Sequence, residues 1–160
     1  MSRSVTLTAT PFDAVDELKA FNVAATGAGA VVSFTGLVRG TTREGAPVMV
    51  LVLESHRTLT LQSMEDIAAA AQARFTISQS RVIHREGRIL PGEPIVFVAT
   101  ASPNRRAALQ AADYIMDRLK SEAVLWKREV GPAGSDWIEP TADDSADLER
   151  WHDDGRSHSE

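Results

Sequence analysis

The sequence contains no cysteine, which excludes disulfides, thiol catalysis, Cys-ligated zinc and iron–sulfur clusters together. It has no apolar run near the roughly 20 residues of a membrane span. Its first ten residues lack the apolar stretch of a signal peptide. We therefore expect a cytoplasmic protein. There is also no surplus of basic residues, since 17 Lys and Arg face 22 Asp and Glu. Such a chain is a poor general nucleic-acid binder.

The net charge of −5 is concentrated at the end of the chain. Residues 140–160 hold seven acids and two arginines, so the first 139 residues balance at 15 acids and 15 bases. At 160 residues the chain has the length of one domain. We expect a single catalytic domain over residues 1–140. An acidic, flexible tail over 141–160 would follow, where Trp151 could anchor part of the chain.

Apolar spacing predicts about three helices among six or seven strands. The helices are expected at 14–22, with Asp13 as N-cap, at 58–74 and at 103–120. The strands are expected at 5–8, 30–38, 48–53, 77–85, 95–99 and 123–130, with a short closing segment at 137–138. The strand at 48–53 is almost wholly apolar, which indicates burial on both faces. Because several strands are joined as hairpins, the pattern favours an α+β fold over a doubly wound parallel sheet.

Six of the 15 basic residues of the body are concentrated between residues 105 and 128. Arg105 and Arg106 would occupy the first helical turn, where backbone N–H groups favour an anion. They are therefore either a phosphate or carboxylate site or a solvated helix start. Lys120 ends the same helix, where a cation suits the dipole and could pair with Asp117.

Lys127 lies in a segment that otherwise has the pattern of a core strand. Alternation places Lys127 and Glu129 on one face and Arg128 on the other. A lysine near apolar walls loses solvation, and its pKa can fall far enough for acid–base catalysis. The alternative is an exposed pair at a strand end. Arg39, at the end of the strand at 30–38, enters a loop where an arginine fork would suit phosphate.

Metal and serine-hydrolase chemistry find no support in the pattern. None of the four histidines shows metal-ligand spacing with another, so no metal is expected. His84 is interpreted as a structural residue of its strand. The chain also lacks the GxSxG elbow of serine hydrolases.

Several separate stretches, in the same order, resemble the large, catalytic subunit of molybdopterin synthase. They are GAVVSFTGLVR at 29–39, VIHREG at 82–87, LPGE with IVFV at 90–98, YIMDRLK at 114–120 and LWKRE at 125–129. The resemblance implies an α+β hammerhead-type fold with a mixed or antiparallel sheet. It implies sulfur transfer to cyclic pyranopterin monophosphate, which forms the dithiolene of molybdopterin without a cofactor.

The resemblance also implies partners. The sulfur donor would be a thiocarboxylate on the C-terminal Gly-Gly tail of a small ubiquitin-like subunit, inserted into the active site. Two large subunits would form a central homodimer within a heterotetramer.

Carried over by motif position, Lys120 and Lys127 match the catalytic lysines, and Arg39 and Arg105 match phosphate and pterin contacts. The other expected substrate-binding residues are Phe34, Leu37, Val38, Asn104, Met116, Arg128 and Glu129. Asn104 stands where the family usually has histidine, and an amide carries no proton or charge near neutral pH. The alternative is therefore a family member that binds the partner or a pterin without turnover, although both lysines are intact.

Overall fold

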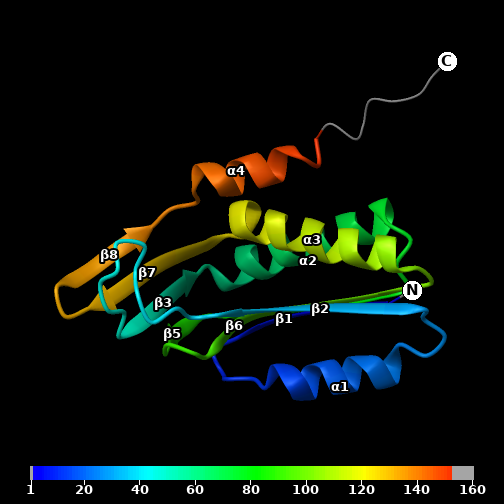
Figure 1. The fold of residues 1–160 in the computed structure, drawn as a ribbon, viewed down its shortest axis with the longest axis horizontal. Coiled ribbons are helices and arrows are strands. Elements are labelled where there is room, and N and C mark those ends of the chain that lie inside the picture. The colour runs from blue at the N-terminus through cyan, green and yellow to red at the C-terminus, as the bar shows by residue number, and fades with distance from the viewer. Residues whose placement is uncertain (1, 153–160) are drawn as a thin grey trace.

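Two four-stranded sheets and four helices organise residues 2–152, the part of the chain described by the computed structural model (Figure 1). The strands are β1 (Ser2–Thr8), β2 (Ala30–Leu37), β3 (Val50–Ser55), β4 (Gln79–Arg85), β5 (Gly87–Ile89), β6 (Pro94–Ser102), β7 (Leu125–Gly131) and β8 (Gly134–Ile138). The helices are α1 (Ala14–Ala24), α2 (Arg57–Arg74), α3 (Arg105–Glu122) and α4 (Ala142–Glu149).

The first sheet has the order β1-β4-β6-β2 and the second the order β5-β3-β7-β8. Only β1 and β4 pair in parallel; every other pairing is antiparallel. The predicted α+β class with a mixed or antiparallel sheet is therefore confirmed. β5 was not predicted, because it has only three residues and starts at Gly87, whose φ of 84° suits glycine.

Helices cover both faces of the first sheet: α1 lies on one face and α2 and α3 lie on the other (Figure 1). Strand alternation divides the apolar side chains accordingly. Phe21 of α1 packs with Ile83 and Phe97, whereas Met64 of α2 and Ile115 of α3 pack in the opposite cluster. No helix of the described residues is long and apolar enough to cross a membrane.

The second sheet extends beyond this sandwich and carries β7. A smaller cluster of Val38, Leu51, Leu53 and Ile89 holds its inner face. Residues 50–53 are all buried, as expected for the predicted strand at 48–53, whereas Met49 in the same range is exposed. The second sheet thus places β7 directly after the C-terminal end of α3 (Figure 1).

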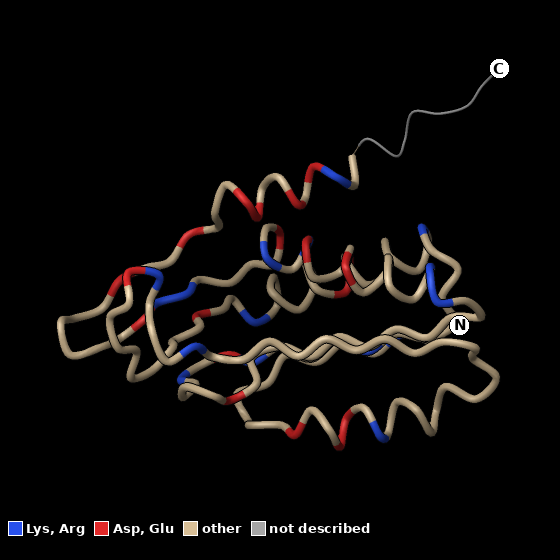
Figure 2. Tube along the Cα trace, viewed as in Figure 1, with Lys and Arg blue, Asp and Glu red and all other residues tan. Residues whose placement is uncertain are grey.

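The expected flexible tail contains a fourth helix, α4, which packs on α3 (Figure 1). Sequence patterning missed it because α4 has no buried residue and hence no apolar stripe. It is held instead by a capping box between Thr141 and Asp144, and by charges, which recur along it (Figure 2). The boundary at residue 140 stays a prediction, and 153–160 lie outside the described residues.

Candidate active site

The junction between α3 and β7 fixes the two lysines relative to each other. Lys120 lies in the last turn of α3, and Lys127 lies near the start of β7. Between them, both the N–H and the carbonyl of Val124 form hydrogen bonds with side chains of α2. The Val124 N–H donates to Ser63 Oγ at 3.2 Å, and the buried Thr60 hydroxyl donates to the Val124 carbonyl.

Lys127 has the electrostatics expected of a proton-transfer group. Burial lowers the pKa of its ammonium below the ordinary value, and the positive charges of Lys120 and Arg39 lower it further. The carboxylate of Asp144 opposes this by raising the pKa. The predicted loss of lysine solvation is therefore present, and three charged groups from separate parts of the chain act on one ammonium.

Lys120 has a different carboxylate partner from the one expected. Its Nζ lies 3.5 Å from Asp144 Oδ1 of α4. The predicted pairing with Asp117 is wrong, because Asp117 is engaged by Arg150 at 2.6 Å and by the Trp151 indole N–H at 2.7 Å. A helix from the end of the chain thus contributes an acid that no spacing within α3 could have revealed.

Arg39 reaches this region from the segment that joins β2 and β3. That segment is attached to β7, since the Met49 N–H donates to the Val130 carbonyl at 2.8 Å. Gly131 has no side chain where the Pro47 carbonyl approaches it, and a Cβ there would collide with this oxygen. The connecting segment therefore lies against the strand of Lys127, and Arg39 is exposed beside it.

Arg128 and Glu129, the two residues that follow Lys127, point to opposite faces of β7. Arg128 lies 5.7 Å from the ring centroid of Trp137 and 4.0 Å from Glu54. Glu129 shares the face of Lys127, and its Oε2 is buried without a hydrogen-bond partner. Only Glu129 of this pair therefore lies on the face of the lysine site.

The remaining expected residues of β2 and the middle of α3 differ in accessibility. Phe34 and Leu37 are exposed on β2, which is an edge strand. Val38 is buried in the small cluster under the second sheet, and Met116 is half-buried against the main core. Val38 thus supports the site as packing rather than as a surface open to substrate.

Asn104 and Arg105 are not brought together with the lysines within one chain. They lie at the start of α3, about 22 Å from Lys120 at 1.5 Å per residue. The Asn104 side chain accepts from the Ala107 N–H at 3.0 Å as the N-cap, and Arg105 and Arg106 line a shallow exposed hollow. The position of the expected histidine therefore has a defined structural function here.

Asp144 was not identified from the sequence as a site residue, and His84 was interpreted only as a structural residue of its strand. The Thr141-x-x-Asp144 spacing is a capping-box pattern that could have indicated the helix, although not its contact with Lys120. His84 is buried with its Nδ1 2.8 Å from the Arg85 carbonyl, and burial is the main cause that lowers its pKa to about 4. The described residues include no group of three side chains placed to hold a metal ion.

The fold is of the α+β class, and its candidate active site is centred on a pair of lysines at the α3–β7 junction. Residues 7–122 match the model of the MoaE protein family. The molybdopterin synthase catalytic subunit of Caulobacter vibrioides is 46% identical over 147 residues, covering 92% of this chain and 96% of that one. The chain belongs to the MoaE family, which confirms the predicted family and its activity class.

Solved structures agree with this assignment. The molybdopterin biosynthesis MoaE protein from Burkholderia ambifaria superposes with a TM-score of 0.79 at 34% identity, covering 94% of this chain and 99% of that one. A complex of subunits 1 and 2 of molybdopterin-converting factor from Helicobacter pylori has a TM-score of 0.70 at 20% identity. It covers 84% of this chain and 89% of that one, and this second likeness concerns the fold alone.

Proposed function

We propose that this site transfers sulfur from a thiocarboxylated carrier to cyclic pyranopterin monophosphate, forming the dithiolene of molybdopterin. The observation that carries the proposal is the lysine pair at the α3–β7 junction, in which Lys127 has a lowered pKa beside the cation Lys120. The names of the curated relatives support the same reaction.

The division of work follows from the surroundings of each group. Lys127 exchanges a proton as the thiocarboxylate sulfur attacks the pterin side chain and the cyclic phosphate opens, because its lowered pKa makes the ammonium easier to deprotonate than that of an exposed lysine. Lys120 provides fixed positive charge for the developing anion. Arg39 binds the phosphate, for which a guanidinium is well shaped.

The carrier is a small ubiquitin-like subunit whose C-terminal Gly-Gly tail enters the site. A protein–protein complex of two subunits is the subject of the Helicobacter pylori structure, which supports such a partner for this fold. The Lys120 side chain is half exposed, which leaves its ammonium available to an inserted tail.

Arg105 enters the site from a second copy of the chain. Its distance from Lys120 along α3 prevents both residues from binding one small substrate within a single chain. The exposed edge strand β2, with Phe34 and Leu37, offers an apolar surface for the homodimer that this requires. Mixing inactive Lys127→Ala protein with Arg105→Ala protein, which is impaired at low pterin concentration, should restore activity at low pterin concentration if the two residues come from different copies. Failure of exchanged dimers to regain activity would contradict this.

The test of the function is a sulfur-transfer assay. The purified protein is mixed with the thiocarboxylated small subunit and cyclic pyranopterin monophosphate, and dithiolene product is followed. Product that disappears in Lys127→Ala supports the proposal. A stable complex with the small subunit that gives no product would favour binding without turnover, and Asn104→His would then be the next variant.

A further inference from the structure

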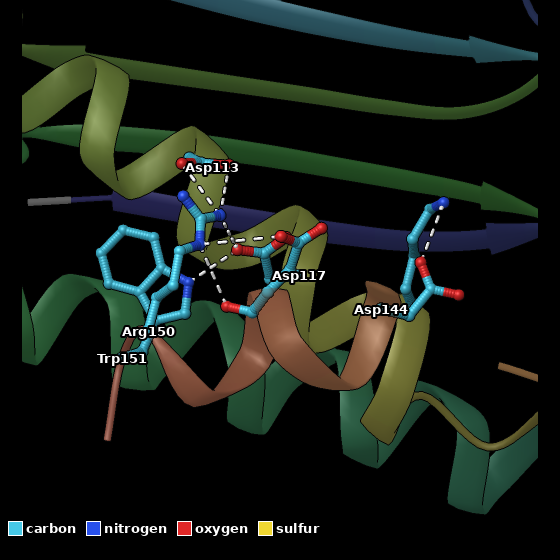
Figure 3. A network of polar contacts seen from close by, with 7 residues as sticks. Asp113, Asp117, Asp144, Arg150 and Trp151 are labelled. Carbon is cyan, nitrogen blue, oxygen red and sulfur yellow. Dashed lines mark hydrogen bonds and ion pairs between the residues drawn. The ribbon is translucent and has the colours of Figure 1, made fainter. Parts of the chain in front are cut away.

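Helix α4 is attached to α3 at two points, one of which is the site lysine. α4 runs antiparallel to α3, so Asp144 near its start meets Lys120, whereas Arg150 just after its end meets Asp117 (Figure 3). The acid of each pair lies on a different helix. This arrangement fixes α4 along the axis of α3.

The far attachment is strong and partly apolar. Asp117 is a buried acid that accepts from Arg150 and from the Trp151 indole N–H (Figure 3). The Trp151 ring stands edge-on to Tyr114 at 5.4 Å and to Phe75 at 5.8 Å between centroids. These contacts hold α4 in place without any contribution from Lys120.

The Asp144 carboxylate is oriented by the backbone before it meets the lysine. Its Oδ2 accepts from the Thr141 N–H at 2.8 Å, and the Asp144 N–H donates to the Thr141 hydroxyl at 3.1 Å. The other oxygen, Oδ1, is the one directed to Lys120 Nζ (Figure 3). The side chain is only 15% exposed, so its position is well determined.

We propose that Asp144 is a positioning residue of the sulfur-transfer site, which holds the Lys120 ammonium in place and makes α4 part of the active site. The inference rests on the proposed function. Because the carboxylate balances one of the positive charges, Lys120 remains the fixed cation while Lys127 exchanges the proton. The two lysines are thereby given different tasks by a residue that belongs to neither of their elements.

The charged and titratable groups around Lys127 come from five parts of the chain. They are Lys120 from α3, Asp144 from α4, Arg39 from the β2–β3 connection, His84 from β4 and, on the same face of β7, Glu129. The Asp144 charge raises the pKa of Lys127, whereas the charges of Lys120 and Arg39 lower it. Removal of the Asp144 charge must therefore lower the pKa of Lys127 further.

The test compares Asp144→Asn with Asp143→Asn in the full-length protein bound to its thiocarboxylated small subunit. Asn at 144 can still accept the Thr141 N–H, so the cap survives while the charge is lost. Asp143 is an exposed neighbour in the same helical turn, and the structure records no ion pair for it within the described residues. Both variants change the net charge equally.

We expect Asp144→Asn to reduce kcat by roughly 10- to 100-fold, the loss that a misplaced group commonly causes. The pH limb of kcat that reports Lys127 should move to lower pH. Asp143→Asn should match the wild type in both respects. Asp144→Glu restores the charge with the residue that capping boxes favour, and should recover most of the activity and the wild-type pH profile.

A second measurement needs no turnover. The side-chain 13Cε resonances of Lys120 and Lys127, assigned with Lys→Arg variants, are titrated by NMR in wild type, Asp144→Asn and Asp143→Asn. We expect the pKa of Lys127 to fall in Asp144→Asn and to stay unchanged in Asp143→Asn. Coincident titrations in all three proteins would overturn the positioning inference, as would a rise in kcat in Asp144→Asn, which would make the contact inhibitory. Inactivity of the wild type instead contradicts the proposed function, while the titrations still test the inference.

Discussion

The two ends of α3 both carry positive charge, but in contrasting surroundings. At the C-terminal end, Lys120 and Lys127 share a crowded region with Asp144, and burial perturbs one of them. At the N-terminal end, Arg105 and Arg106 are exposed in a shallow hollow, without an ion pair recorded among the described residues.

This difference separates two uses of a cation. Desolvation and neighbouring charges bring a lysine pKa toward the range where it exchanges protons. An exposed guanidinium keeps its charge and binds anions, aided at this end by the N–H groups of the first helical turn. In the proposed mechanism, the C-terminal end of α3 therefore adjoins the proton-transfer group on β7, and the N-terminal end of α3 binds an anion.

Loss of Lys127 should have the largest effect on activity, because it removes the proposed proton-transfer group at the C-terminal end of α3. Lys127→Ala should reduce sulfur transfer by about 10²–10⁴-fold, the range of general acid–base catalysis. Lys127→Arg keeps the positive charge, but a guanidinium does not deprotonate near neutral pH. This variant should therefore be similarly impaired. Dithiolene formation is measured, with circular dichroism as the check on folding. Near-normal sulfur incorporation in either variant would remove Lys127 from the mechanism.

The buried His84, which lies near Lys127, should make the free energy of unfolding depend on pH. Its pKa is lowered from 6.5 to about 4 in the folded protein, so the unfolded chain binds more protons between these values. The stability that comes from keeping His84 neutral is therefore fully present above pH 6.5, and it is lost as the pH falls from 6.5 towards 4. The contribution lost by pH 4.5 is about 2–3 kcal/mol. Urea unfolding at pH 7.5 and 4.5 measures it.

His84→Leu is the matched variant for that experiment, since it removes the titrating group and leaves the carboxylates in place. The fall in unfolding free energy between the two pH values should be smaller in the variant by the amount given above. Equal falls in both proteins would show that His84 does not titrate as its burial requires.

Arg105→Ala should affect binding more than chemistry. If this guanidinium holds the substrate phosphate as a fixed charge, KM for the pterin should rise about tenfold, about 1.4 kcal/mol, with little change in kcat. Arg106→Ala, next to it in the same hollow, is the control. Steady-state kinetics with varied pterin separates the two parameters. A fall in kcat alone would place Arg105 in the chemistry and remove the contrast between the ends.

Loss of the Thr60 hydroxyl should give the smallest effect. Thr60→Val removes the buried hydrogen bond to the Val124 carbonyl, and should cost about 1 kcal/mol of unfolding free energy. It should also lower kcat by loosening the spacing of the two lysines. Thr58→Val, on the exposed surface of the same helix, is the control for both readouts. A stability loss without a change in kcat would show that the junction does not set this spacing.

Local patterns predicted most of the regular elements, because burial imposes periodicity on the sequence. Asp13 was expected as the cap of α1, and its carboxylate accepts from the N–H groups of Val15 and Asp16. The periodic segment at 58–74 corresponds to α2, Arg57–Arg74. α4 was missed because tertiary charge pairs hold it, and such pairs leave no periodic signal in the sequence.

For the candidate site, the sequence indicated individual residues but not how they are arranged. The apolar surroundings of Lys127 indicated its desolvation, which is a property of its own segment. The partner of Lys120 depended on how a distant helix docks, so the nearest acid in sequence, Asp117, was the wrong choice. By contrast, the helix expected at 103–120 already placed Asn104 and Arg105 a whole helix length from Lys120, and the structure agrees.

The close approach of Pro47 to Gly131 limits how this protein can vary over generations. Any side chain at 131 would meet the Pro47 carbonyl and push the connecting segment away from β7. Gly45, at the exposed turn of that segment, has open space around it, although its φ of 86° still favours glycine. Substitution of Gly131 would therefore displace the segment that carries Arg39, although the two are far apart in the sequence.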